Sequence, residues 1–119
     1  MRVLIVDDNV EFLATVHRLL EQGGMVVVGE ATSGAEAVQR ARDHDPDVIL
    51  VDVELGDESG FEVVEQLSAV GGLRASLVLV SAHERGDLSD LLETSPAVGF
   101  LAKSDLTARR IAELLDDTK

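Results

Sequence analysis

Five short apolar runs rich in β-branched residues recur along the chain, and each is followed by a stretch with helical spacing. Because the runs are nearly continuous rather than alternating, they are typical of strands covered on both faces of a sheet. Consecutive β-α units require a parallel sheet with right-handed crossovers and helices on both faces. The sequence therefore predicts a doubly wound α/β fold. The expected strands are residues 3–6, 25–28, 48–51, 77–80 and 98–101.

The stretches between the runs predict the helices. Ser33 followed by Glu36 has the spacing of a capping box, which indicates the start of the second helix. Gly23 and Gly71 each follow an amphipathic stretch, where glycine is suited to ending a helix. The expected helices are residues 10–22, a second helix starting at 33, and residues 59–70, 87–93 and 105–116.

Length and composition narrow the possibilities further. We expect the 119 residues to form one domain, residues 1–119. The net charge of −13 argues against nucleic-acid contact by this chain and favours cationic partners, metal ions included. The lack of cysteine excludes disulfides and a thiol nucleophile and suits a cytoplasmic protein. The apolar runs are too short to cross a membrane, and the first residues do not resemble a signal peptide.

The residues after each expected strand are the first candidates for chemistry, since doubly wound sheets bind ligands beyond the carboxyl ends of their strands. Asp7 and Asp8 follow the first run, and Asp52 follows the third. Ser81 follows the fourth run and Lys103 closely follows the fifth. We therefore expect three carboxylates, a hydroxyl and an ammonium at one edge of the sheet.

These side chains suit a metal ion together with a phosphoryl group. Three neighbouring carboxylates repel one another unless a cation lies among them, and ligation by oxygen alone suits Mg²⁺. A phosphoryl group between Mg²⁺ and Lys103 would also account for Ser81, and one carboxylate could act as the nucleophile of aspartyl-phosphate chemistry. Lys103 is the only lysine besides the terminal Lys119, and its compact ammonium suits a single phosphoryl group.

Four segments resemble the receiver domain of two-component response regulators, of which the chemotaxis regulators are one type. They are Val-Asp-Asp-Asn at 6–9, Val-Asp-Val-Glu-Leu-Gly-Asp-Glu-Ser-Gly at 51–60, Val-Ser-Ala at 80–82 and Gly-Phe-Leu-Ala-Lys at 99–103. Each alone is weak, but together, in order and at strand ends, they are specific. The resemblance covers essentially the whole chain and implies a flavodoxin-like (βα)₅ fold with strand order 2-1-3-4-5.

The resemblance also implies a role for each candidate residue. Asp52 would accept a phosphoryl group from the phosphohistidine of a sensor histidine kinase. Ser81 and Lys103 would bind phosphoryl oxygens, and Phe100 matches the switch aromatic that turns inward as the serine moves. The implied Mg²⁺ ligands are Asp7, Asp8, Asp52 and the Val53 carbonyl.

The partners implied are the kinase and an output domain or downstream protein. The expected contact face is the fourth helix, fifth strand and fifth helix, and receivers of this kind often dimerise on phosphorylation. Such a domain catalyses its own phosphotransfer and dephosphorylation but turns over no metabolite.

Several positions depart from the family pattern or add to it. Gly56 stands where proline is common, which predicts a looser loop after Asp52. Ser104 replaces a proline that often follows the lysine, so the sequence leaves the Lys103–Ser104 bond open between cis and trans. Glu54 and His83 are expected near the site entrance, and we hypothesise that they set the lifetime of the aspartyl phosphate.

Plainer interpretations stand beside these. Asp8 or Asn9 would suit the cap of the first helix, and Phe100 could simply fill the core. His17 and His44 lack metal-ligand spacing and are expected to be ordinary surface residues.

Other function classes are open on the same fold. A non-phosphorylated interaction module would keep the fold but usually loses an acid or the lysine. A flavodoxin-like carrier is disfavoured because Asp7 and Asp8 would repel flavin phosphate. A Mg²⁺-dependent phosphohydrolase is loosely imitated by Asp52-Val53-Glu54.

Overall fold

A five-stranded parallel sheet forms the centre of the protein, with the strand order β2-β1-β3-β6-β7. The computed structural model describes residues 1–82 and 95–116. Because β4 and β5 form a separate hairpin, this order is 2-1-3-4-5 along the chain, and the prediction is confirmed. The sheet strands are β1 (Arg2–Val6), β2 (Val26–Ala31), β3 (Val48–Asp52), β6 (Ser76–Ser81) and β7 (Gly99–Ala102). The helices are α1 (Val10–Gln22), α2 (Gly34–His44), α3 (Gly60–Ser68) and α5 (Ala108–Asp116).

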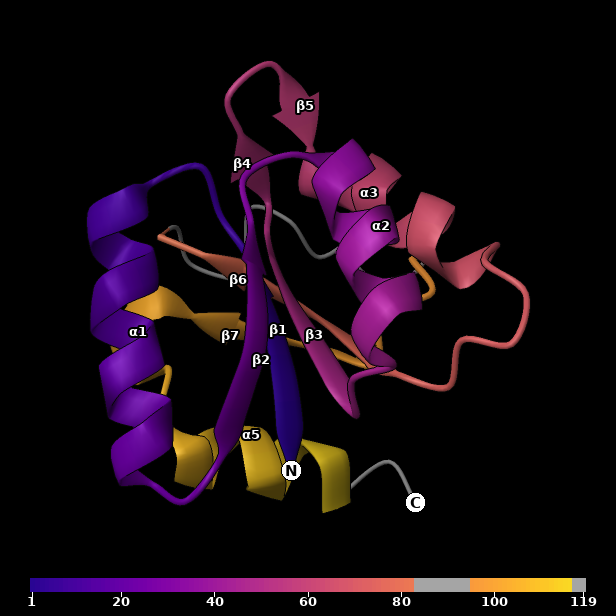
Figure 1. The fold of residues 1–119 in the computed structure, drawn as a ribbon. Helices are drawn as coiled ribbons and strands as arrows, with labels where there is room; N and C mark the ends of the chain where they lie inside the picture. The colour runs from indigo at the N-terminus through magenta and orange to yellow at the C-terminus, as the bar shows by residue number, and fades with distance from the viewer. Residues whose placement is uncertain (83–94, 117–119) are drawn as a thin grey trace.

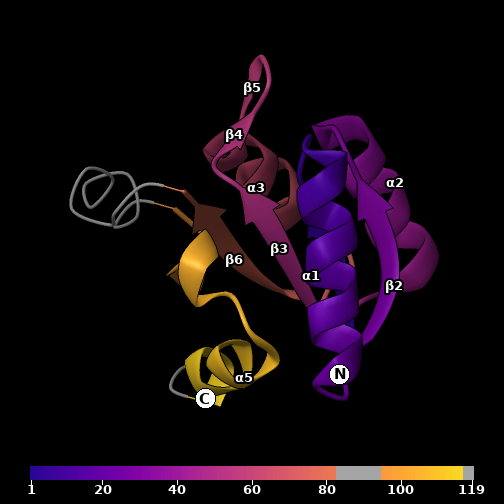
Figure 2. The ribbon, with the colours of Figure 1, turned by 90° about the vertical axis from the view of Figure 1, so that its left-hand side faces the viewer.

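Helices cover both faces of the sheet, as the continuous apolar runs predict (Figure 1, Figure 2). Along β1, Val3 and Ile5 join one apolar cluster, while Leu4 and Val6 join the other. The first cluster contains side chains of α1 and α5, and the second contains those of α2 and α3. All five residues of β3 are buried, so this central strand is enclosed from both sides.

The start of α2 confirms the predicted capping box only in part. The Ser33 hydroxyl accepts a hydrogen bond from the Glu36 N–H at 3.2 Å, as expected for the cap. The Glu36 carboxylate, however, bonds to Thr32 rather than returning to the Ser33 N–H. Thr32 offers two donors, its N–H and its hydroxyl, each 2.8 Å from the same oxygen.

Other element boundaries differ from the predictions. The second strand extends to Ala31 because Ala31 pairs with Val6 of β1. The third helix ends at Ser68, two residues before the predicted end. The last helix begins at Ala108 instead of 105, because the Thr107 hydroxyl caps it by accepting from the Arg110 N–H. The expected fourth helix at 87–93 lies outside the described residues.

A small hairpin that we did not predict follows the third strand of the sheet. Its strands are β4 (Glu54–Leu55) and β5 (Glu58–Ser59), which pair antiparallel. Gly56 has a φ of +60° in the two-residue turn, a conformation that glycine adopts without strain. Gly56 thus lies in an ordered hairpin turn, while the predicted looser loop after Asp52 stays a prediction. Glu58 also accepts a hydrogen bond from the Gly34 N–H at 3.0 Å, which ties the hairpin to α2.

No helix in residues 1–82 and 95–116 is long and apolar enough to span a membrane.

Candidate functional site

Three carboxylates meet at the carboxyl ends of β1 and β3. These strands are hydrogen-bonded neighbours, so Asp7 and Asp52 lie side by side, with Asp8 next to them. Asp7 is 1% exposed and Asp52 is 7% exposed, whereas Asp8 is open to solvent. One carboxylate oxygen from each of the three lies within 4.8 Å of the others. The structure thus brings together the acids that the sequence placed at one sheet edge.

Backbone groups orient the two buried carboxylates. The Asn9 N–H donates to Asp7 Oδ1 at 2.9 Å, and the Glu54 N–H donates to Asp52 Oδ1 at 3.2 Å. Asn9 also caps α1, because its side-chain oxygen accepts from the N–H groups of Glu11 and Phe12. The cap interpretation is therefore correct for Asn9. It is compatible with a site at Asp7, since the same residue orients that carboxylate.

Lys103 bridges the remaining oxygens of these two acids. Its Nζ lies 2.9 Å from Asp7 Oδ2 and 3.2 Å from Asp52 Oδ2. Lys103 begins a short 3₁₀ turn, Lys103–Asp105, directly after β7. The Lys103–Ser104 bond is trans, because the described residues contain no cis peptide. Asp7 Oδ2 accepts no hydrogen bond within the described part of the chain, so its contact with Lys103 is an ion pair without hydrogen-bond geometry.

The charges at this site do not balance. Burial and, to a smaller extent, the Asp7 charge raise the pKa of Asp52 to about 6, against the opposing effects of the Glu54 N–H and Lys103. Burial disfavours the charged form of Lys103, but the two acids outweigh this effect and raise the pKa of Lys103. The single positive charge of Lys103 thus lies beside three carboxylates and cannot neutralise all of them. Their all-oxygen donor set and the buried oxygen of Asp7 without a hydrogen bond fit an added divalent cation.

A cavity of about 320 Å³ opens beside Asp52. Ser81 ends β6 and is 1% exposed, yet it lines this cavity together with Asp52 and Lys103. Glu54 is exposed and also lines the cavity, at the base of the hairpin. The full lining is Asp8, Asn9, Asp52, Glu54, Gly56, Ser81, Ala82 and Lys103. The cavity therefore brings the Ser81 hydroxyl and the Lys103 ammonium next to the buried carboxylate of Asp52.

The remaining predicted site residues are Val53, Phe100 and His83. The Val53 carbonyl accepts a hydrogen bond from the Gly60 N–H at 2.7 Å, which leaves one lone pair of that oxygen for another partner. Phe100 is half-buried, packs against the second apolar cluster and lines a hollow beside α5. His83 lies outside the described residues.

Phe12 is a site neighbour that we did not predict. The centroid of its ring lies 4.2 Å from the Lys103 Nζ. In the sequence Phe12 belongs to the apolar face of the first helix, and nothing there links it to Lys103. The spacing from Asn9, three residues earlier, was the available signal, since a cap fixes the direction of the first helical turn.

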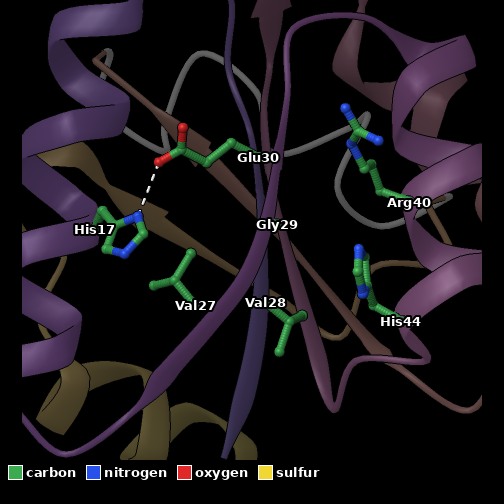
Figure 3. Close-up of a pocket in the computed structure, with 7 residues that line it drawn as sticks. All are labelled: His17, Val27, Val28, Gly29, Glu30, Arg40 and His44. Carbon is green, nitrogen blue, oxygen red and sulfur yellow. Dashed lines mark hydrogen bonds and ion pairs between the residues drawn. The ribbon is translucent and has the colours of Figure 1, made fainter.

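A larger hollow of about 460 Å³ lies at the outer edge of β2 (Figure 3). On one side of the strand His17 Nδ1 lies 3.0 Å from Glu30 Oε2, and on the other side lie Arg40 and His44. The two histidines therefore lie on opposite sides of β2 and face different surroundings. No cluster of acids converges here among the described residues, so the cavity at Asp52 is the candidate functional site.

The comparison with protein families agrees with this geometry. The model of the response regulator receiver domain matches residues 3–116. The chain belongs to this family. The receiver domain is 27% identical to the chemotaxis protein CheY of Bacillus subtilis, over 98% of this chain and 96% of that protein. It is 32% identical over 114 residues to a putative transcriptional regulator of Pseudomonas aeruginosa, covering 96% of this chain and 53% of that protein.

Solved structures show the same likeness. The receiver domain of the putative response regulator NarL from Mycobacterium tuberculosis superposes with a TM-score of 0.79 at 34% identity, over 98% of this chain and 94% of that one. The chain spans about half the length of the first curated relatives that it matches. Those relatives therefore contain further segments beyond the region that this chain matches.

Proposed function

We propose that this receiver domain is a phosphorylation-operated switch that accepts a phosphoryl group on Asp52 from the phosphohistidine of a sensor histidine kinase. The observation that carries the proposal is the Lys103 ammonium held between two buried acids beside a cavity that Ser81 also lines. The switch comprises residues 1–119 and works in the cytoplasm. Like most receiver domains of regulators, it acts in signalling and converts no metabolite.

The chemistry would be a single phosphoryl transfer. A carboxylate oxygen of Asp52 attacks the phosphorus, the P–N bond of the phosphohistidine breaks, and the imidazole nitrogen keeps the electron pair of that bond. Lys103 lies close enough to pair with one phosphoryl oxygen, and Ser81 lines the same cavity and can donate to another. Both groups then oppose the negative charge that gathers on the phosphoryl oxygens.

The acids suit Mg²⁺ as the partner of this reaction. The proposed ligands are Asp7, Asp8, Asp52 and the Val53 carbonyl. When bound, Mg²⁺ supplies charge neutralisation and orientation for the phosphoryl oxygens. The excess of three carboxylates over one ammonium supports this assignment, because the buried acids otherwise remain incompletely neutralised.

Phosphorylation would change the surface of the protein on the β7 side of the sheet. The acyl phosphate carries almost two negative charges where the Asp52 carboxylate carried one, and Ser81 and Lys103 move towards them. Phe100 is half-buried next to a hollow beside α5, so an inward turn of its ring would change this surface. We propose that β7, α5 and the expected helix at 87–93 form the contact face for an output domain or downstream protein, and for a phosphorylation-dependent dimer.

Intact mass spectrometry tests the phosphoacceptor directly. The protein is incubated with Mg²⁺ and acetyl phosphate, with Asp52→Asn as the control. We expect one phosphoryl adduct that requires Mg²⁺ and is absent from the control. Mg²⁺ binding without an adduct from acetyl phosphate or from a phosphorylated histidine kinase would overturn the proposal and favour a non-phosphorylated interaction module.

Glu54 and His83 are the proposed determinants of the phosphate lifetime. Glu54 is exposed at the cavity, where it can contact a water molecule that approaches the acyl phosphate. We expect Glu54→Ala and His83→Ala to change the dephosphorylation rate severalfold, as measured by the decay of the adduct mass. Unchanged rates in both variants would remove these residues from the mechanism.

A further inference from the structure

We propose that the face of the Phe12 ring positions the Lys103 ammonium over Asp52, which makes Phe12 a positioning residue of the phosphotransfer site. The proposal rests on the proposed function for its effect on phosphorylation. It rests on geometry alone for the contact itself, since the Lys103 Nζ lies 4.2 Å from the ring centroid. A cation at this distance is attracted by the negative face of an aromatic ring.

The ring supplies a contact that the two acids do not. An ammonium has three donors, and the charges of Asp7 and Asp52 attract it from the direction of the sheet edge. The contact with Asp7 Oδ2 lacks hydrogen-bond geometry, so no hydrogen bond to this oxygen fixes the direction of the ammonium. Phe12 comes from α1 and approaches the ammonium from a separate element. With Phe12 in place, contacts from Asp7, Asp52 and Phe12, on three different segments, together define its position.

Local structure explains why Lys103 depends on contacts at its tip. Lys103 lies in a 3₁₀ turn outside the strand ladder, followed by Ser104 instead of the rigid proline ring. Its side chain has four rotatable bonds, which must be ordered before the ammonium can face Asp52. Phe12, in contrast, is held by the capped first turn of α1, because its N–H donates to the Asn9 side chain at 3.1 Å.

The same cap links Phe12 to the acid site. Asn9 donates its N–H to Asp7 Oδ1 and accepts from the Phe12 N–H, so one residue orients both an acid and the ring. The ring is partly buried against the first apolar cluster, which limits its movement. The receiver domain thus presents the lysine with a rigid aromatic surface built by the helix that follows the acidic pair.

Substitutions at Phe12 test the proposal through phosphorylation. We expect Phe12→Leu to slow Mg²⁺-dependent phosphorylation by acetyl phosphate about fivefold to thirtyfold, the range that one cation–π contact of a partly buried ammonium represents. Phe12→Tyr keeps an aromatic face and should stay within about twofold of the parent. Phe61→Leu is the matched control, because Phe61 is also partly buried but packs on the opposite cluster; its rate should not change.

A double-mutant cycle separates positioning from general packing. In a Lys103→Met background, Phe12→Leu should add less than about a twofold further change, because the ammonium that the ring positions is gone. A loss in that background as large as in the parent protein would overturn the proposal. Equal losses in Phe12→Tyr and Phe12→Leu would overturn it as well.

NMR gives a readout that does not depend on the proposed function. With only two lysines in the chain, the ε-methylene signals of Lys103 and Lys119 are readily assigned. We expect the Lys103 signals to show an upfield ring-current shift that Phe12→Tyr retains and Phe12→Leu removes. If this shift is present but no variant accepts a phosphoryl group, the proposed function fails while the contact stands. If the shift is absent from the parent protein, the positioning proposal fails.

Discussion

Asp52 combines three conditions at the scale of a single residue: burial, a neighbouring acid and a lysine within 3.2 Å. Burial and the Asp7 charge outweigh the lysine, which is why the pKa of Asp52 is raised to about 6. A bound cation stabilises the ionised form of such a buried carboxylate, and without one the ionised form destabilises the folded protein. The same imbalance that favours metal binding therefore predicts measurable effects on the stability of the metal-free protein.

The first prediction concerns pH. The folded-state pKa of about 6 lies above the unfolded value of about 3.9, so metal-free protein loses stability as the pH rises from about 4 through 6. Asp52→Asn, which cannot ionise, should escape this loss and be more stable at pH 7 by about 1–2 kcal/mol. Urea unfolding in chelator, followed by circular dichroism, measures the difference. A difference that is the same at pH 4 and pH 7 would contradict the prediction.

The second prediction concerns Lys103. Lys103→Met leaves Asp7 and Asp52 without their cation, and the free energy of unfolding should fall by about 3 kcal/mol in chelator. Added Mg²⁺ should restore part of the loss, because it replaces the missing positive charge. The control is Arg109→Met, which removes an exposed pair with Glu113 and should cost less than about 1 kcal/mol. Equal losses in the two variants would show that the Lys103 pairs are not stabilising.

At the scale of elements, the segment after Asp52 decides how the site is built. The hairpin β4–β5 is tied to α2 through Glu58, and α3 starts directly after it at Gly60. A Cβ at Gly60 would overlap the backbone carbonyl oxygen of Asp52 and lie 2.7 Å from Val53 Cα. The close approach of α3 to the strand end thus requires glycine, and this packing fixes the position of the backbone at Asp52.

Gly60→Ala tests this close approach. We expect the free energy of unfolding to fall by more than about 2 kcal/mol, because backbone atoms must move to admit the methyl group. Gly71→Ala is the matched control, since no atom lies within 4 Å of its added Cβ, and stability there should be unchanged or slightly higher. Urea unfolding of both variants gives the comparison. A Gly60→Ala variant as stable as Gly71→Ala would contradict the packing.

At the scale of the whole molecule, the parallel sheet gathers residues that are distant in sequence. Asp7, Asp52, Ser81 and Lys103 each lie at or just beyond the carboxyl end of a strand, so a single edge carries the site. The net charge of the chain is −13, which repels anions that approach this edge. A cation at the site therefore neutralises the neighbouring acids and also lowers the overall charge repulsion of the protein. These two effects on stability can be measured separately.

Salt and magnesium should stabilise the metal-free protein differently. Sodium chloride screens the global repulsion, while Mg²⁺ at a hundredfold excess over its dissociation constant adds about 2.7 kcal/mol beyond a matched ionic strength. Asp8→Asn should lose the specific Mg²⁺ effect, whereas Asp43→Asn, the same charge change on α2, should retain it. Thermal unfolding by circular dichroism reports both. An Mg²⁺ effect equal in the two variants would place the ion elsewhere.

The chain's local patterns were sufficient for the architecture and for the acid cluster. Continuous apolar runs identified buried parallel strands, and strand ends identified Asp7, Asp8, Asp52, Ser81 and Lys103, because parallel strands share one carboxyl edge. These inferences need only periodicity and the rule that parallel strands share one carboxyl edge, whereas the strand order was implied by the resemblance to receiver domains.

Contacts between distant elements were decided by tertiary structure alone. The Thr32 partner of Glu36, the Glu58 contact with Gly34 and the Phe12 ring against Lys103 depend on side-chain directions that no local pattern encodes. The raised pKa of Asp52 likewise follows from burial and neighbours that meet only after folding. Periodicity places a residue on a face or at an edge, but packing decides which atoms then meet.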